Sequence, residues 1–287
     1  MLNTDGTPPT GLASLVDQVT PSVGYLLSRS SRGSCWAISK NELVTNAHVV
    51  EGLSGQPIQV RIGGKLIDAK VLGSDMRTDI AVIRVKHALK SLVLAQDFKV
   101  GDFCLAVGSP HGFVNSVSFG VVSGINRSVP SSEGVLENLL QTDAAINSGN
   151  SGGPIFNMSG EVIGMSTLSR VEAEAMHYAI SSQMIAFIAP RLIKEKLIAY
   201  GRIGALLAEK IDTSGATNVS VVRPMGSQSN LRVRDEVLAI DGRKVQRRVD
   251  VLYAMVEGAD QTSFQVSVRR EGVVRKLKVA NVQDGED

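Results

Sequence analysis

The sequence predicts a mainly β protein with two domains, a large one of antiparallel strands and a smaller α+β one after it. First, residues 23–167 read as short strands separated by turns, with few helical patterns. Second, a helical pattern at 184–198 ends this region, and a second set of strands with one helix follows from Gly201 onward. Third, a length of 287 residues exceeds the ~250 at which a single core stops growing.

The strands of the first region are recognised by their apolar pattern. Apolar residues alternate with polar ones over 58–62 and 67–71, and Gly63-Gly64 between them predicts a hairpin turn. Apolar runs at 80–85, broken only by Arg84, and at 105–107 predict strands buried on both faces. Many short strands of this kind indicate a sandwich or a barrel.

The second region begins after a connecting helix, in which Pro190 is expected to produce a kink or a restart. Its predicted elements are strands around Leu206, over 219–222 and over 237–240, a helix over 250–256 ended by Gly258, and a hairpin at Glu271-Gly272. We therefore expect an N-terminal segment at 1–20, a β domain at 21–182, a helical linker at 183–200 and a small domain at 201–287.

Charge and cysteine content exclude several classes of protein. The formal net charge is +2, too small to gather nucleic acid or an anionic membrane. No apolar run approaches the ~18 residues of a membrane span, and residues 1–9 lack the pattern of a secretory signal. The compartment stays open: either the protein works in the cytoplasm where it is made, or a targeting segment is removed by processing. Cys35 and Cys104 have no ligand or redox spacing, so no zinc or other cofactor is predicted, and two buried thiols are favoured over a disulfide.

Residues 149–154, Gly-Asn-Ser-Gly-Gly-Pro, form the most specific string in the chain. The glycines allow a tight turn that exposes the Ser151 hydroxyl and lets backbone amides converge on a tetrahedral oxyanion. We expect this oxyanion hole in the segment Gly149, Asn150 and Ser151, with the amides of Gly149 and Ser151 as donors. The string also fits a nucleophile elbow, but Ser151 leads into a hairpin rather than a helix. A phosphate loop would need a Gly-Lys-Ser or Gly-Lys-Thr sequence, which is absent.

A serine hydroxyl is a weak nucleophile until a base takes its proton. His48 lies among apolar and small residues at the end of a predicted strand, where an imidazole can be held in place. The other three histidines, His87, His111 and His177, lie in polar or loop contexts typical of the surface. We therefore select His48 as the candidate base.

A catalytic imidazole also needs a buried carboxylate on its second nitrogen. Asp79 directly precedes the apolar run at 80–85 and is the best candidate. Asp68 and Asp75 are interpreted as solvated hairpin charges, and Asp102 and Asp143 are weaker alternatives. Histidine, aspartate and serine, in that order across an all-β region, follow the chymotrypsin arrangement. The sequence thus predicts a serine endopeptidase with His48, Asp79 and Ser151 as its catalytic residues.

The sequence resembles the HtrA or Deg serine proteases. The matching text is Thr45-Asn46-Ala47-His48-Val49-Val50, Asp79-Ile80-Ala81-Val82, Ala106-Val107-Gly108-Ser109-Pro110, Gly120-Val121-Val122-Ser123 and Gln141 to Pro154, with Gly160-Glu161-Val162-Ile163-Gly164 added. The resemblance implies two six-stranded β-barrels with the active site between them, followed by a PDZ domain at 201–287.

The resemblance also implies roles for further residues. Ile146 stands at the floor of the first specificity pocket, beside a substrate-pairing wall formed by Met165, Ser166, Thr167 and Leu168. Ile203, Gly204, Ala205 and Leu206 stand where the family binds the carboxylate of a peptide terminus. An apolar floor predicts cleavage after small or medium aliphatic residues.

The family implies ATP-independent cleavage of unfolded or misfolded proteins, peptide C-termini as PDZ partners, a homotrimer, and a periplasmic or organellar location after processing. Two alternatives stay open. One is a chaperone-like scaffold whose triad is held in an inactive or switchable geometry, and the other is a PDZ adaptor that carries an inactive protease.

Overall fold

The computed structural model describes residues 11–28, 32–53, 55–108, 116–132, 134–146, 149–169, 176–211, 216–225 and 230–282. The chain divides into two compact units, one up to Ile198 and one from Ala199 onward. Each unit is described by itself.

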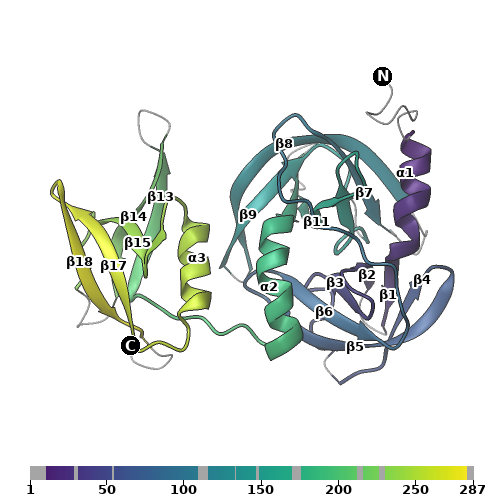
Figure 1. Ribbon diagram of the computed structural model, residues 1–287, viewed down its shortest axis with the longest axis horizontal. Coiled ribbons are helices and arrows are strands. Elements are labelled where there is room, and N and C mark those ends of the chain that lie inside the picture. The colour runs from purple at the N-terminus through teal and green to yellow at the C-terminus, as the bar shows by residue number, and fades with distance from the viewer. Residues whose placement is uncertain are drawn as a thin grey trace. The chain divides into compact units, whose positions relative to one another are not determined.

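The first half of unit 1 is a closed barrel with the strand order β1-β2-β3-β6-β5-β4 (Figure 1). Its strands are β1 (Val23–Leu27), β2 (Arg32–Ala37), β3 (Glu42–Thr45), β4 (Ile58–Ile62), β5 (Lys65–Asp75) and β6 (Ile80–Val85). β4 and β5 form the predicted hairpin, with Ile58 opposite Ala69 and a turn in which Gly63 and Gly64 have φ of 54° and 75°. The alternating pattern therefore points one face of this hairpin into the barrel.

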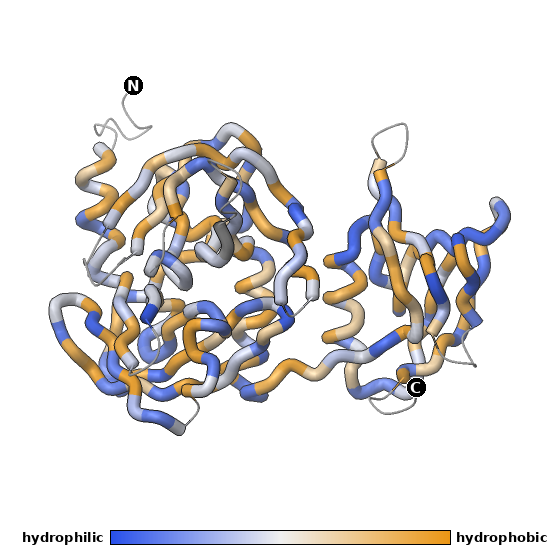
Figure 2. Tube along the Cα trace, turned by 180° about the vertical axis from the view of Figure 1, so that it is seen from behind, coloured by the Kyte–Doolittle hydropathy of each residue, from blue (hydrophilic) through white to orange (hydrophobic). Residues whose placement is uncertain are grey.

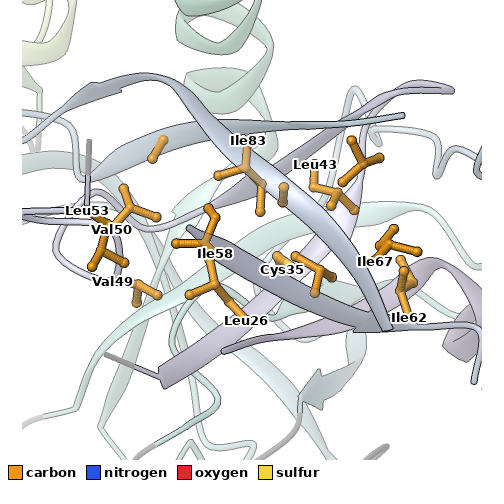
Figure 3. Close-up of a cluster of buried hydrophobic side chains, with 14 of the residues drawn as sticks. Leu26, Cys35, Leu43, Val49, Val50, Leu53, Ile58, Ile62, Ile67 and Ile83 are labelled. Carbon is orange, nitrogen blue, oxygen red and sulfur yellow. The ribbon is translucent and has the colours of Figure 1, made fainter. Parts of the chain in front are cut away.

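The barrel interior is filled by aliphatic side chains that converge from all six strands and the segment after β3 (Figure 3). Leu26, Cys35, Leu43 and Ile83 are all fully buried in this cluster. Burial of a full aliphatic side chain contributes about 1.5–3 kcal/mol, so this core is the main support for the residues at the barrel rim. Cys35 is a free thiol in the core, and burial raises its pKa far above the ordinary value.

The second half of unit 1 is another closed barrel, with the strand order β10-β11-β12-β9-β8-β7. Its strands are β7 (Phe103–Gly108), β8 (Ser116–Ser131), β9 (Gly134–Thr142), β10 (Pro154–Phe156), β11 (Val162–Ser169) and β12 (His177–Ser181). Cys104 is also a buried free thiol, so the prediction of two buried thiols is confirmed.

The described residues of unit 1 also include two α-helices and a short 3₁₀ turn. α1 (Leu12–Val19) runs into the turn η1 (Thr20–Ser22), and α2 (Ser182–Glu195) contacts strands of both barrels. Ser181 caps α2 by accepting a hydrogen bond from the amide of Met184. α2 continues through Pro190 as one helix, so no restart occurs there. Because it packs on both barrels, α2 stabilises unit 1 as well as leading out of it.

Unit 2 contains a sheet of order β13-β14-β15-β17-β18, with β16 paired to β15. Its elements are β13 (Ala205–Ile211), β14 (Thr217–Pro224), β15 (Glu236–Ile240), β16 (Arg243–Lys244), α3 (Arg248–Glu257), β17 (Ser263–Arg270) and β18 (Val273–Ala280). Figure 2 shows hydrophobic and hydrophilic stretches alternating along these strands. The buried face packs against α3, and the fully buried Phe264 lies in this core.

The predicted fold class is confirmed: the chain is mainly β, with a chymotrypsin-like pair of barrels and a small α+β unit. Among the described residues, no helix combines the length and apolar character needed to cross a membrane.

Candidate active site

His48 lies in the turn that leaves β3 of the first barrel. Two hydrogen bonds hold this turn against the carbonyl oxygen of Asp79, one from the Ala47 amide and one from Asn46 Nδ2, both 3.2 Å long. Asn46 and Ala47 are fully buried. The backbone around His48 is therefore fixed by the same residue whose side chain faces the imidazole.

The imidazole of His48 contacts the carboxylate of Asp79 directly. His48 Nδ1 lies 2.9 Å from Asp79 Oδ1 and 3.0 Å from Oδ2, and the His48 amide donates to Oδ1 at 3.1 Å. The His48 side chain is 40% exposed and that of Asp79 is 8% exposed. One ring edge is thus held by a buried carboxylate while the ring remains open to solvent, as a general base requires.

The pKa of His48 is raised above its ordinary value. Burial alone would lower it, because a protonated ring loses solvation. The hydrogen bond to Asp79 and the charges of Asp79 and Glu51 favour the protonated ring and outweigh burial. The site therefore stabilises the imidazolium that forms when the ring accepts a proton.

A second aspartate, Asp75, shapes the turn that presents Asp79. Asp75 Oδ2 accepts hydrogen bonds from both the amide and the hydroxyl of Thr78, and Asp79 then adopts a φ of 55°, which is uncommon for a residue with a side chain. Asp75 is 8% exposed. The interpretation of Asp75 as a solvated hairpin charge was wrong, because the turn at the end of β5 folds its carboxylate inward.

Thr167 of β11 also contacts the carboxylate. Its hydroxyl donates to Asp79 Oδ2 from a position 88 residues away in the sequence, and Thr167 is 6% exposed. Sequence reasoning placed Thr167 in a substrate-binding wall and missed this contact. No local pattern signals it, since it depends on how the second barrel packs on the first.

Ser151 lies on the loop that precedes β10 of the second barrel. The loop backbone is bound to β2 of the first barrel, because Ser34 donates from its amide to the Ser151 carbonyl and from its hydroxyl to the Gly149 carbonyl, each at 2.8 Å. Gly149 has a φ of 100°, a conformation open mainly to glycine. The predicted need for glycine beside the serine therefore has a structural reason.

Gly33 shows how near the serine lies to the histidine turn. A Cβ atom on Gly33 would lie 2.6 Å from Cγ1 of Val49, the residue after His48, and 3.2 Å from the carbonyl oxygen of Ser151. The hydrogen bonds of the described His48 side chain are those to Asp79, and none to the Ser151 hydroxyl is among them. The structure thus brings the His48 and Ser151 segments together, with no hydrogen bond between these two side chains in the described part of the chain.

The predicted pocket residues lie on and around β11. Ile146 is 3% exposed and belongs to the core of the second barrel. Met165 and Ser166 are buried, and the backbone of Ser166 pairs with Gly152 and Gly153 of the serine loop. Leu168 pairs with Tyr178 of β12, and its side chain lies outside the described residues. β11 therefore supports the serine loop through its main chain.

The other candidate acids and bases lie elsewhere. His87 is exposed, His111 lies outside the described residues, and His177 begins β12, where burial lowers its pKa against the opposing charge of Asp143. Asp102 and Asp143 accept hydrogen bonds from backbone amides, and Asp68 accepts one from Gln59. In the described part of the chain, the carboxylate on the His48 ring is that of Asp79.

In unit 2, the predicted peptide-binding residues lie at the start of the edge strand β13. Gly204 has a φ of 55°, and its carbonyl accepts a hydrogen bond from the amide of Met225. Ile203 is 4% exposed and lies in the core, whereas Leu206 is 49% exposed. β13 contacts α3, and Glu209 of β13 accepts a hydrogen bond from the Arg248 amide at the start of that helix.

Two closed barrels, a histidine–aspartate pair from the first and a serine loop from the second define the trypsin-like class of serine proteases. The family model of the trypsin-like peptidase domain matches residues 33–165. A solved structure of Deg5 is 32% identical, with a TM-score of 0.57, and the match covers 64% of this chain and 95% of that one. The chain belongs to the HtrA/Deg family.

Two further proteins are similar over nearly the whole chain. A probable periplasmic serine endoprotease DegP-like of Halomonas elongata is 31% identical over 275 residues, which are 89% of this chain and 57% of that protein. The chain thus spans little more than half the length of this relative. A structure of the HtrA-type protease AlgW with a tripeptide is 24% identical, with a TM-score of 0.80, and covers 96% of this chain and 99% of that one. This similarity in structure supports the fold described above for the chain.

Proposed function

We propose that this chain is a serine endopeptidase in which Ser151 is the nucleophile, His48 the general base and Asp79 the orienting acid. The observation that carries this proposal is the contact between His48 Nδ1 and the buried Asp79 carboxylate, 2.9 Å long, beside a glycine-rich serine loop bound to the same barrel. Family membership supports it, since the relatives are described as serine endoproteases.

In the proposed reaction, His48 Nε2 takes the Ser151 proton while Ser151 Oγ bonds to the substrate carbonyl carbon. The carbonyl π electrons move onto oxygen and form the tetrahedral oxyanion. The intermediate then expels the amine, which takes the proton from Nε2, and leaves an acyl-enzyme. Water then attacks the acyl carbon as His48 Nε2 takes its proton, and collapse of the second intermediate breaks the bond to Ser151 Oγ, which takes the proton from Nε2 and releases the acid. Asp79 holds the ring and stabilises its positive charge throughout.

The amides of Gly149 and Ser151 are the proposed donors to the oxyanion, with Asn150 between them. Losing one such donor costs on the order of 10²–10³-fold in rate, and acid–base help contributes roughly 10²–10⁴-fold. Both contributions are needed for hydrolysis at a useful rate.

The proposed substrates are unfolded or misfolded proteins, cleaved without ATP. Ile146 and the neighbouring part of β11 carry no acidic group that would select Lys or Arg, so we propose cleavage after small or medium aliphatic residues. The test is digestion of an unfolded model protein and mapping of the cleaved bonds by mass spectrometry. Cleavage mainly after Lys or Arg would contradict this specificity.

A fluorophosphonate probe tests the enzyme directly. Wild-type chain is expected to react at Ser151, and Ser151→Ala is expected to lose both labelling and proteolysis. A matched control is Ser22→Ala, which changes a buried serine hydroxyl without a hydrogen-bond partner among the described residues. Labelling that persists in Ser151→Ala would contradict the assignment of the nucleophile.

The second candidate function is a peptide-binding scaffold whose protease site rests in an inactive or switchable geometry. The observation that favours it is that the hydrogen bonds of the described His48 ring do not include one to Ser151. Catalytic hydrogen bonds often tighten only when substrate binds, so this geometry also suits an active enzyme. Tight binding of unfolded chains without fluorophosphonate labelling would favour the scaffold.

For unit 2 we propose a PDZ domain that binds peptide C-termini along β13. Three features support this: β13 is an edge strand, α3 lies beside it, and a turn at Gly204 precedes it. A peptide strand can extend such an edge by main-chain hydrogen bonds. The half-exposed Leu206 offers an apolar contact for the bound peptide.

This proposal is tested on the full Ser151→Ala chain by fluorescence anisotropy. Peptides with a free C-terminus are expected to bind more tightly than amidated ones, and Leu206→Lys is expected to weaken binding. Equal binding of free and amidated peptides would contradict recognition of the carboxylate.

A homotrimer and a location outside the cytoplasm complete the proposal. The stacked pair Phe103 and Phe119, whose ring centres lie 5.3 Å apart, is about half exposed and offers an apolar surface for self-association. We also propose that the N-terminal segment at 1–20 takes part in self-association; residues 1–10 of this segment lie outside the described residues. Light scattering tests the trimer and cell fractionation tests the location.

A further inference from the structure

Ser34 of the first barrel binds the serine loop of the second barrel on both sides of Asn150. Its amide donates to the carbonyl of Ser151 and its hydroxyl donates to the carbonyl of Gly149, at 2.8 Å each. Ser34 is fully buried, and Gly149 is 115 residues away in the sequence. A single residue thus joins the two barrels at the serine loop, through its amide and its hydroxyl.

These two hydrogen bonds restrain the part of the loop that matters for the proposed reaction. Each peptide group is planar, so holding the carbonyls of Gly149 and Ser151 holds two peptide planes. The peptide between them carries the Ser151 amide, a proposed oxyanion donor, and the Ser151 Cα follows it. The side-chain oxygen of Asn150 is buried without a hydrogen-bond partner among the described residues. This atom therefore does not restrain the loop backbone.

The same serine is linked to the segment that carries the base. Thr45 Oγ1, three residues before His48, donates to the Ser34 carbonyl at 2.7 Å. Gly152 packs on this link so closely that a Cβ there would lie 2.2 Å from the Ser34 carbonyl oxygen and 2.5 Å from Thr45 Oγ1. The contacts therefore run from the His48 segment through Ser34 to the loop of Ser151.

We propose that Ser34 is a positioning residue, whose hydroxyl holds the serine loop in the backbone conformation that aligns the nucleophile and the oxyanion donors. This inference rests on the proposed endopeptidase function. Ser34 does not touch the substrate in this proposal, so it acts on the rate through the loop alone.

The kinetic test compares Ser34→Ala with Ser22→Ala, which alters a fully buried serine that lacks this role. Misplacement of reacting groups by ~1 Å can cost ~10²-fold, so Ser34→Ala is expected to lower kcat by about tenfold or more with KM changed by less than about twofold. Affinity for a peptide boronate, which mimics the tetrahedral intermediate, is expected to fall by a similar factor. Ser22→Ala is expected to match wild type in both.

A second readout does not depend on activity. Amide hydrogen exchange of the Gly152 and Gly153 amides, which bond to Ser166 and Asn150 carbonyls, is expected to be faster in Ser34→Ala than in wild type and unchanged in Ser22→Ala. Unchanged exchange, or unchanged kcat, would overturn the proposal. The proposal would also be overturned if Ser34→Ala raised KM by the same factor by which it lowered kcat and bound the boronate as tightly as wild type. If wild type neither hydrolyses peptides nor reacts with fluorophosphonate, the proposed function fails, while exchange still decides whether Ser34 holds the loop.

Discussion

The two barrels contribute to the candidate site in different ways. The first barrel carries both residues of the proposed acid–base pair, in which Asp79 accepts hydrogen bonds from the ring and the amide of His48, and Thr167 of the second barrel adds a third donor. The second barrel presents Ser151 on a glycine loop that is tied mainly through its main chain. If the proposed function holds, this difference means a preformed His48–Asp79 pair and a Ser151 loop whose alignment depends on its supports. Changes in the pair should alter rate and pH profile together, whereas changes in the loop should alter rate alone.

Asp79→Asn is expected to have the largest effect among the supports of the site. Loss of the carboxylate removes the acceptor that orients the ring, so kcat/KM is expected to fall by about 10³–10⁴-fold. The two larger causes that raise the pKa of His48, both from Asp79, are weakened or lost, while burial and the weaker effect of Glu51 remain, so the acid limb of kcat/KM against pH moves to lower pH. Asp68→Asn, at an exposed carboxylate, is the control. An acid limb that stays in place would contradict the pairing.

Gly152→Ala tests the loop. Gly152 has a φ of 81°, and an added Cβ would lie 2.2 Å from the Ser34 carbonyl oxygen, which leaves no room for a methyl group, so the loop must shift. We expect a loss of kcat/KM of about 10²-fold with the acid limb unchanged.

Gly64→Ala is the matched control for the loop variant. Gly64 has a similar φ of 75° in the β4–β5 hairpin, but nothing lies within 4 Å of an added Cβ. It is expected to cost about 1 kcal/mol of stability and to leave activity unchanged. Equal loss of activity in both variants, measured well below their melting temperatures, would show that strain alone explains the effect.

Thr167→Val removes a hydroxyl that donates to Asp79 without changing the size of the side chain much. Since a hydrogen bond to a charged group contributes about 1.5–3 kcal/mol, a loss of about tenfold in kcat/KM is expected. With one donor fewer on its carboxylate, Asp79 interacts more strongly with the protonated His48 ring and raises the pKa of His48 further. The acid limb therefore moves to higher pH, in the direction opposite to that expected for Asp79→Asn. A shift to lower pH would contradict this account.

The smallest expected effect concerns the pH at which wild-type activity falls, and the small shift of that pH in Glu51→Gln. Only the neutral ring accepts a proton, and the raised pKa of His48 keeps the ring protonated to higher pH than its ordinary value of 6.5 allows. Activity is therefore expected to fall on acidification with a midpoint above pH 6.5. Glu51→Gln removes the weakest of the raising causes and should move this midpoint down by less than Asp79→Asn does. A wild-type midpoint below 6.5 would contradict the direction.

Local patterns were sufficient for many elements of the fold. The hairpins at Gly63-Gly64 and Glu271-Gly272 occur where predicted, and the helix expected at 250–256 lies within α3 (Arg248–Glu257). Each depends on residues close together in the chain, whose alternation and turn chemistry act locally. The choice of Asp79 was possible because it directly precedes a buried strand.

The remaining contacts required the folded chain. Asp75 looked like a hairpin charge because its burial arises from a turn that curls back on Thr78, and periodicity does not reveal such a turn. Thr167 reaches Asp79 across 88 residues, and Ser34 reaches Gly149 across 115. The spacing of residues in the sequence does not predict which loops come into contact when two barrels pack together.

The sequence by itself determined the mainly β class, the two-unit organisation and the residue types able to form a base, an acid and a nucleophile. These follow from local apolar periodicity, glycine positions and side-chain chemistry. Only the tertiary structure decided what supports each of them: Thr167 behind the acid, Asp75 beneath its turn and Ser34 against the serine loop. The physical reason is that hydrogen bonds act over about 3 Å, and barrel packing alone brings residues so distant in the chain within that range.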